Sequence, residues 1–153
     1  MNDQPTSRMC FVCGRENPCG LHMRFTEDAE AGQVRAELSV PDVYQGYPGV
    51  VHGGIIAAML DEVSGRAILL GGKEELMVTL RLTVRYRQPT PTNTPLVVLG
   101  WMERISGVGA RVAGEVRLPD GTVTADCEAV LSHISDSFRV GWADEQPYWR
   151  VTE

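Results

Sequence analysis

Residues 44–72 read YQGYPGVVHGGIIAAMLDEVSGRAILLGG, and this stretch decides the fold. Residues 55–60 carry no polar side chain, and a pair of glycines closes the stretch at its end. Residues that favour helices dominate between these limits, which predicts a helix over about residues 53–70. Because the first half of this helix is apolar on every side, we expect another part of the chain, most simply a sheet, to wrap it.

The acid Asp61 follows this apolar run directly, with Glu62 beside it. An ionised carboxylate that is buried without a partner is costly, so such groups usually pair or change their pKa. Two interpretations are open. Either Asp61 lies on a wetted part of the helix, as most acids do, or it is a catalytic carboxylate in an environment set by the apolar helix. We adopt the second as the working hypothesis.

Alternation of apolar and polar residues predicts strands on both sides of the helix. One candidate strand, residues 33–40, precedes it, and four follow it at residues 77–88, 96–105, 108–118 and 122–134. The Asp-Gly pair at 120–121 separates the last two and is typical of a hairpin. This order predicts an α+β fold in which a curled antiparallel sheet wraps one long central helix. Such a sheet leaves an edge and a face available to a second copy of the chain.

In the candidate strand 77–88, one row of alternating residues is apolar and the other is polar. The apolar row is Val78, Leu80, Leu82, Val84 and Tyr86, and the polar row is Thr79, Arg81, Thr83, Arg85 and Arg87. The arginines either form a solvated face of the sheet or meet the phosphates of a ligand.

Size and composition describe an ordinary globular domain, with 153 residues, 43% of them apolar and 22% charged. The net charge of -6 argues against nucleic-acid binding, and no apolar run reaches the length of a membrane span. The polar residues 1–8, expected to be a loose leader, do not resemble a secretory signal, so we expect reduced cysteines and a cytoplasmic protein. We divide the chain into a leader with a cysteine-containing knuckle (1–22), the main domain (23–134) and an irregular tail (135–153).

Four potential metal ligands lie close together near the N-terminus: Cys10, Cys13, Cys19 and His22. Their residue types suit zinc, but the loop between Cys13 and Cys19 is shorter than that of typical zinc fingers. A redox CxxC is also conceivable, although no strand-helix unit surrounds it. We therefore favour a structural knuckle with no metal.

Several motifs together resemble the hotdog-fold acyl-CoA thioesterases of the phenylacetate-pathway (PaaI-like) type. They are Gly49-Val50-Val51-His52-Gly53-Gly54, Asp61 nine residues after the histidine, Thr79 eighteen residues after Asp61, and Tyr86-Arg87-Gln88-Pro89-Thr90-Pro91. The opening Cys10-Phe11-Val12-Cys13-Gly14, with Asn17-Pro18 and Gly20-Leu21, is similar to a subgroup that carries this knuckle ahead of the domain.

The resemblance implies a role for each matching residue and no cofactor. His52 holds the site in shape, the Gly53 N–H binds the thioester oxygen, Asp61 is nucleophile or general base, and Thr79 assists the attacking water. Relatives often have an asparagine where this chain has Gly46, and the neighbouring Gln45 is the candidate replacement. The candidate substrate-binding residues are Gln45, Gly54, Arg81 and Arg87.

The same chemistry follows from the helix itself, because a helix N-terminus presents unpaired N–H groups and partial positive charge. Gly53 lies at that end, and the eight residue steps to Asp61 span about 12 Å. Reacting atoms must approach to about 3–3.5 Å, so Gly53 and Asp61 of one chain cannot serve the same carbonyl. If both act in one site, Asp61 comes from a second copy, which predicts a homodimer or a tetramer built from two such dimers.

We therefore expect an enzyme that hydrolyses an acyl-CoA to a free acid and CoA, with no nucleic-acid or membrane partner. The first alternative is a protein that binds acyl-CoA without hydrolysing it, which Gly46 favours. A hydroxyacyl-thioester dehydratase ranks last, because the approach loop 47–52 lacks the usual arrangement of those enzymes.

Overall fold

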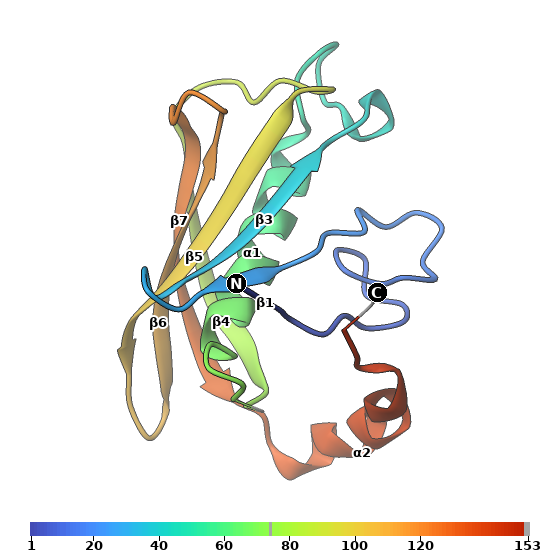
Figure 1. Ribbon diagram of the computed structural model, residues 1–153, viewed down its shortest axis with the longest axis vertical. Coiled ribbons are helices and arrows are strands. Elements are labelled where there is room, and N and C mark those ends of the chain that lie inside the picture. Colours follow the sequence, from blue (N-terminus) through green and yellow to red (C-terminus); the bar gives the residue numbers. More distant parts are fainter. Residues whose placement is uncertain (74, 152–153) are drawn as a thin grey trace.

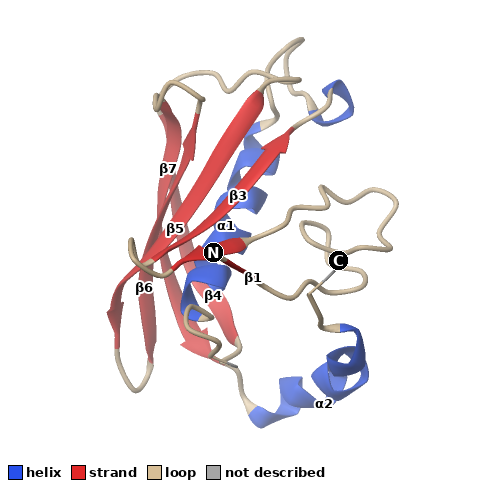
Figure 2. Cartoon of the chain, in the orientation of Figure 1, coloured by secondary structure: helices blue, strands red, loops and turns tan. Residues whose placement is uncertain are grey.

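The computed structural model describes residues 1–73 and 75–151, and within these residues an antiparallel sheet curls around one helix (Figure 1). The helix is α1 (Gly53–Ile68). The strands are β1 (Asn2–Asp3), β2 (Thr26–Asp28), β3 (Gln33–Ser39), β4 (Met77–Tyr86), β5 (Pro95–Ile105), β6 (Gly109–Arg117) and β7 (Val123–His133). Their order in the sheet is β1-β2-β3-β5-β6-β7-β4. The predicted α+β fold is confirmed, and Figure 2 shows α1 lying along one face of the strands.

Helix α1 begins where it was predicted and ends two residues before the expected end. The N–H of Gly54 donates to Nδ1 of His52, the N-cap residue, at 2.9 Å, which satisfies one of the free amides of the first turn. After Ile68 the chain turns through Gly71, whose φ of +79° suits a residue without a Cβ. No helix among the described residues is long and apolar enough to cross a bilayer.

One face of α1 is fully buried against the sheet, through Ile56, Met59, Leu60, Val63 and Ala67. The sheet approaches this face closely at Gly100 and Gly114, which pair across β5 and β6. A Cβ on Gly100 would lie 2.7 Å from the carbonyl oxygen of Val63, so a larger residue there would push the helix off the sheet.

The opposite face of α1 is only partly covered. Gly54 is exposed, and Ala58, Asp61 and Gly65 are half-buried. These residues recur at the i, i+4, i+7 and i+11 spacing that places them in one row along a helix. A single chain therefore leaves a stripe of small residues around one carboxylate without a full cover.

Strand β4 is the edge of the sheet beside this stripe, and it carries a bulge. Thr79 pairs with Leu131 and Arg81 pairs with Val130, so Leu80 has no opposite residue on β7. The extra residue reverses the alternation: Thr79 faces α1 before the bulge, and the half-buried Leu82 faces the core after it. The prediction of one apolar and one polar row along residues 77–88 is therefore wrong at this point.

Two further predictions are wrong, those of a loose leader and of an irregular tail. β1 pairs with β2, Thr6 forms a bridge with Arg150, and Gln4 and Ser7 are buried. The tail contains α2 (Asp136–Glu145) and the 3-10 helix η2 (Gln146–Tyr148). Elsewhere in the chain, the short 3-10 helix η1 (Asp42–Tyr44) precedes α1. The N–H of Thr6 donates to the carbonyl oxygen of Arg150 at 2.9 Å, so the two terminal segments run next to each other at this point.

Candidate active site

Asp61 on α1 and Thr79 on β4 are in direct contact. The Thr79 hydroxyl donates to Oδ1 of Asp61 at 2.7 Å. A hollow of about 190 Å³ opens beside this pair and includes Gly65, Leu69 and Met77 in its lining. The hydroxyl fixes one carboxylate oxygen, and both residues line the hollow. The sequence predicted both residues as parts of one site, and the bulge in β4 is what brings Thr79 to the helix.

The other predicted site residues, His52 and Gly53, lie at the N-terminus of α1. Nδ1 of His52 accepts the Gly54 N–H, so the neutral ring carries its proton on Nε2. The N–H of Gly53 precedes the first intrahelical hydrogen bonds and is available to a ligand. A second hollow, of about 760 Å³, is lined by His52 and Gly53 together with Gly46, Tyr86 and Arg87.

Tyr86 is a site residue that the sequence did not single out. Its hydroxyl donates to the carbonyl oxygen of Gly53 at 2.6 Å and so ties the end of β4 to the start of α1. The alternation of residues 77–88 places Tyr86 only in the apolar row of a strand. The motif Tyr86-Arg87-Gln88-Pro89 is the sequence signal that could have identified the tyrosine as a site residue.

Gln45 and Gly54 take different places from those expected of substrate-binding residues. The exposed side chain of Gln45 turns into its own loop, where Oε1 accepts the Gly49 N–H at 3.3 Å. Gly46, not Gln45, lines the hollow beside His52. The Gly54 amide already donates to Nδ1 of His52, so it is not free to meet a ligand.

The two arginines predicted to bind substrate, Arg81 and Arg87, are both exposed on or just beyond β4. Arg87 forms an ion pair with Asp126, and Arg85 lies 3.9 Å from the same carboxylate. Two guanidinium groups thus share one carboxylate, and of these three residues only Arg87 lines the larger hollow. Arg81 follows the bulge and lines neither of the two hollows described above.

Within one chain, Gly53 and Asp61 open onto different hollows. They are separated by eight residue steps of continuous helix, about 12 Å, as the sequence predicted. The structure therefore assembles two half-sites, Asp61 with Thr79 and His52 with Gly53. It does not unite them in a single chain.

The four N-terminal ligand candidates do not gather around one point. Sγ of Cys10, Sγ of Cys13 and a carboxylate oxygen of Glu62 lie within 4.8 Å of one another. Cys19 is exposed, and Nε2 of His22 contacts the carbonyl oxygen of Asn17 instead. Among the described residues, the two cysteines of the CxxC motif are thus grouped with the central helix and apart from the other two candidates.

A family model described as the thioesterase superfamily matches residues 48–125, a span that includes His52, Gly53, Asp61 and Thr79. The acyl-coenzyme A thioesterase THEM4 of Xenopus laevis is 32% identical over 81 residues, which are 52% of this chain and 35% of that protein. The chain thus spans about a third of the length of this relative.

Two crystal structures share the fold. One is of a thioesterase superfamily protein, with 36% identity and a TM-score of 0.73, covering 80% of this chain and 62% of that one. The other is of a putative thioesterase of Ralstonia eutropha JMP134, described as related to phenylacetic acid degradation. It has 25% identity and a TM-score of 0.65, covering 73% of this chain and 85% of that one.

Proposed function

The chain belongs to the thioesterase superfamily, with the hotdog fold, and from this premise we propose that it hydrolyses the thioester bond of an acyl-CoA. The observation that carries the proposal is the hydrogen bond between Thr79 and Asp61, which holds a carboxylate on the uncovered stripe of α1. A carboxylate held in this way can activate a water molecule as a general base or attack the carbonyl carbon itself.

The electrophile is activated at the other half-site. The Gly53 N–H and the partial positive charge of the helix N-terminus stabilise the negative charge that develops on the thioester oxygen. His52 fixes the first turn through its bond to the Gly54 amide, and Tyr86 holds the Gly53 carbonyl from the other side. Arg87, at the mouth of the same hollow, is placed to meet phosphate groups of CoA.

We further propose that the two half-sites meet across a homodimer. β4 is a ten-residue edge strand with exposed apolar side chains, including Leu80 at 68% exposure. Such an edge is a template for pairing with another chain. A second copy placed there would also cover the stripe of Gly54, Ala58, Asp61 and Gly65, and would bring its own Asp61 toward Gly53 of the first copy.

The primary test is hydrolysis of a panel of acyl-CoA substrates, followed by a reagent that detects the released CoA thiol. We expect turnover by the natural chain and its loss in Asp61→Asn, which keeps the size of the side chain and removes its basicity. Tight binding of acyl-CoA without thiol release would overturn the proposal of hydrolysis. It would support the alternative of a protein that binds acyl-CoA without hydrolysing it, which Gly46 favours. Undiminished turnover by Asp61→Asn would overturn the role of this carboxylate.

The oxyanion donor can be removed without removing the helix. Gly53→Pro deletes the N–H at the first helical position, where proline is well tolerated. His52, with φ −57° and ψ 136°, already has a conformation that precedes proline comfortably. The expected loss in kcat is about 10²–10³-fold. Gly53→Ala is the matched control, because it keeps the N–H and its Cβ would lie at an ordinary 3.4 Å from the Tyr86 hydroxyl.

Mixing the two inactive variants tests the shared site. In a mixed dimer of Asp61→Asn and Gly53→Pro chains, one site combines the intact Gly53 of the first chain with the intact Asp61 of the second. After random exchange of subunits, about a quarter of the natural activity should return, because half of the dimers are mixed and each holds one intact site. Activity that stays at the level of the separate variants would show that each site is built by one chain.

A further inference from the structure

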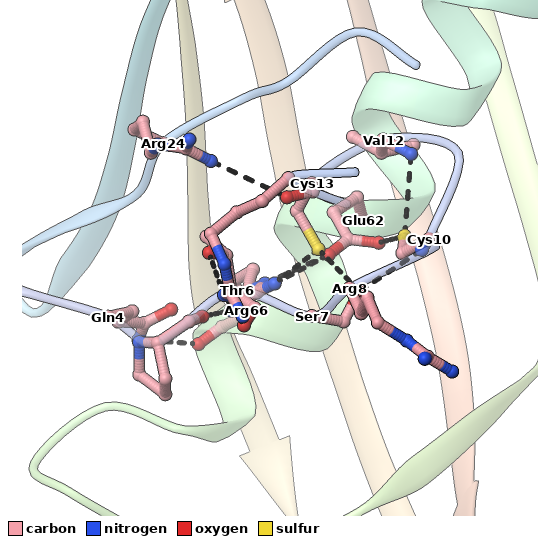
Figure 3. A network of polar contacts seen from close by, with 12 residues as sticks. Gln4, Thr6, Ser7, Arg8, Cys10, Val12, Cys13, Arg24, Glu62 and Arg66 are labelled. Carbon is pink, nitrogen blue, oxygen red and sulfur yellow. Dashed lines mark hydrogen bonds and ion pairs between the residues drawn. The ribbon is translucent and has the colours of Figure 1, made fainter. Parts of the chain in front are cut away.

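The CxxC turn near the N-terminus folds back onto α1, where it contacts Glu62, the residue after Asp61, and Arg66. The N–H of Gly14 donates to the carbonyl oxygen of Cys10 at 2.8 Å and closes a turn that brings Cys10 and Cys13 together. Their two sulfur atoms and a carboxylate oxygen of Glu62 lie within 4.8 Å of one another (Figure 3). A turn of this kind holds two cysteines at the separation that a disulfide can span.

The two sulfur atoms differ in access to solvent and in their hydrogen bonds. Cys10 is half-buried, and its sulfur accepts the N–H of Val12 at 3.4 Å, whereas Cys13 is only 1% exposed. A hydrogen bond from Cys13 lowers the pKa of Cys10 to about 7, although burial acts against it. The same bond, together with burial, raises the pKa of Cys13. Cys10 can therefore react as a thiolate, whereas Cys13 stays a protonated thiol.

The position that a metal ion would need beside these sulfur atoms is taken by a guanidinium group. Nη2 of Arg66 lies 2.9 Å from Sγ of Cys13 and 2.9 Å from Oε1 of Glu62. This side chain is 2% exposed and is packed between the rings of Phe25 and Trp149. The described residues also offer only three ligand atoms here, whereas structural zinc takes four. The surroundings thus suit sulfur chemistry better than a cation.

We propose that Cys10 and Cys13 form a redox-active dithiol, which a small-molecule disulfide converts reversibly to an intrachain disulfide. The Cys10 thiolate attacks one sulfur of the small disulfide, forms a mixed disulfide and releases one small thiol. Cys13 then attacks the Cys10 sulfur, forms the intrachain bond and releases the second small thiol. The protein loses two electrons and two protons, and the small disulfide gains both.

The Cys10–Cys13 pair takes no part in the proposed thioester hydrolysis, but it lies next to the hollow that contains Asp61. Glu62 accepts a hydrogen bond from the Cys10 thiol at 3.5 Å, and this bond is lost when the disulfide forms. Glu62 and Arg66 also line the hollow that contains Asp61. Each of the two sulfur atoms therefore contacts a side chain of α1 that lines this hollow: Cys10 contacts Glu62, and Cys13 contacts Arg66.

The test uses the full chain with Cys19→Ser, which removes the exposed thiol outside the cluster. The protein is equilibrated in buffers of graded reduced and oxidised glutathione and quenched with acid. Free thiols are then alkylated and counted by intact-mass and peptide mass spectrometry. Of the four cysteines, this variant keeps three. We expect Cys10 and Cys13 to lose their thiols together, with recovery after dithiothreitol, while Cys127 stays reduced, because burial raises its pKa to about 11.

Removing the buried cysteine separates the two steps. With Cys13→Ser added, Cys10 should stop as a mixed disulfide with glutathione. With Cys10→Ser, Cys13 should stay reduced because it is buried. The proposal is overturned if both thiols persist in the most oxidising buffer. It is equally overturned if the reduced protein holds stoichiometric zinc that must be chelated before Cys10 and Cys13 can be alkylated. Neither of these two results requires a variant that alters the buried cluster.

Discussion

The hydrogen bond from Thr79 to Asp61 gives the sharpest prediction, made with Thr79→Val. This substitution keeps the branched shape that suits a strand and removes only the donor. The bond is 2.7 Å long and its acceptor is a carboxylate, and hydrogen bonds to charged groups contribute about 1.5–3 kcal/mol. Because 1.36 kcal/mol corresponds to a tenfold change in rate, kcat should fall by about 10- to 150-fold if Thr79 holds the carboxylate in its reactive position.

The assay is steady-state release of the CoA thiol, with kcat and KM measured separately. Thr79→Ser should keep most of the activity because it keeps the hydroxyl. Thr83→Val is the matched control: it lies four residues along the same strand, is exposed and, after the bulge, faces away from α1. Adding Thr79→Val to Asp61→Asn should cost little more than Asp61→Asn alone, since the two residues act as a pair. Equal losses from Thr79→Val and Thr83→Val would refute the reasoning, as would a Thr79→Val enzyme within twofold of the natural chain.

Three other predictions follow from the same structure. Gly14→Ala should destabilise the fold by about 1–3 kcal/mol or more in urea unfolding, because its Cβ would lie 2.3 Å from the backbone oxygen of Cys10. Gly141→Ala, a helix position with open space, should be neutral or stabilising, and a similar loss in both variants would contradict this view. Arg66→Met should lower the free energy of unfolding by about 3–5 kcal/mol, because it leaves a largely buried carboxylate without its partner, and an unchanged urea midpoint would disprove the importance of this pair. Arg87→Gln should raise KM for acyl-CoA with kcat nearly unchanged, since it removes a charge at the mouth of the hollow; a fall in kcat alone would exclude this binding role.

The structure also shows why the ends of the chain were difficult to predict. Residues 1–8 are polar in sequence, and the tail carries no clear periodicity. Their order comes from Arg66, whose buried guanidinium donates to the carbonyl oxygen of Pro5 and lies against Trp149. Contacts between residues so far apart in the chain leave no local pattern, which is why the sequence alone predicted a loose leader and an irregular tail.

What the sequence by itself determined is the set of local features. The apolar run with Asp61 specified the central helix, and the alternating segments specified the five long strands, because each pattern reflects a period of the backbone. The motif around His52 and Gly53 placed the start of that helix, with His52 as its N-cap residue. The length of the helix between Gly53 and Asp61 already separated these groups within one chain.

Only the tertiary structure decided which side chains meet. Strict alternation put Thr79 in the same row as the arginines, and a one-residue bulge at Leu80 turned it toward Asp61 instead. The same bulge allows Tyr86 to reach the Gly53 carbonyl farther along the strand. A bulge depends on the pairing of β4 with β7, about fifty residues away, and not on the residues of β4 alone. For that physical reason the candidate site residues could be named from the sequence, whereas the contacts between them could not.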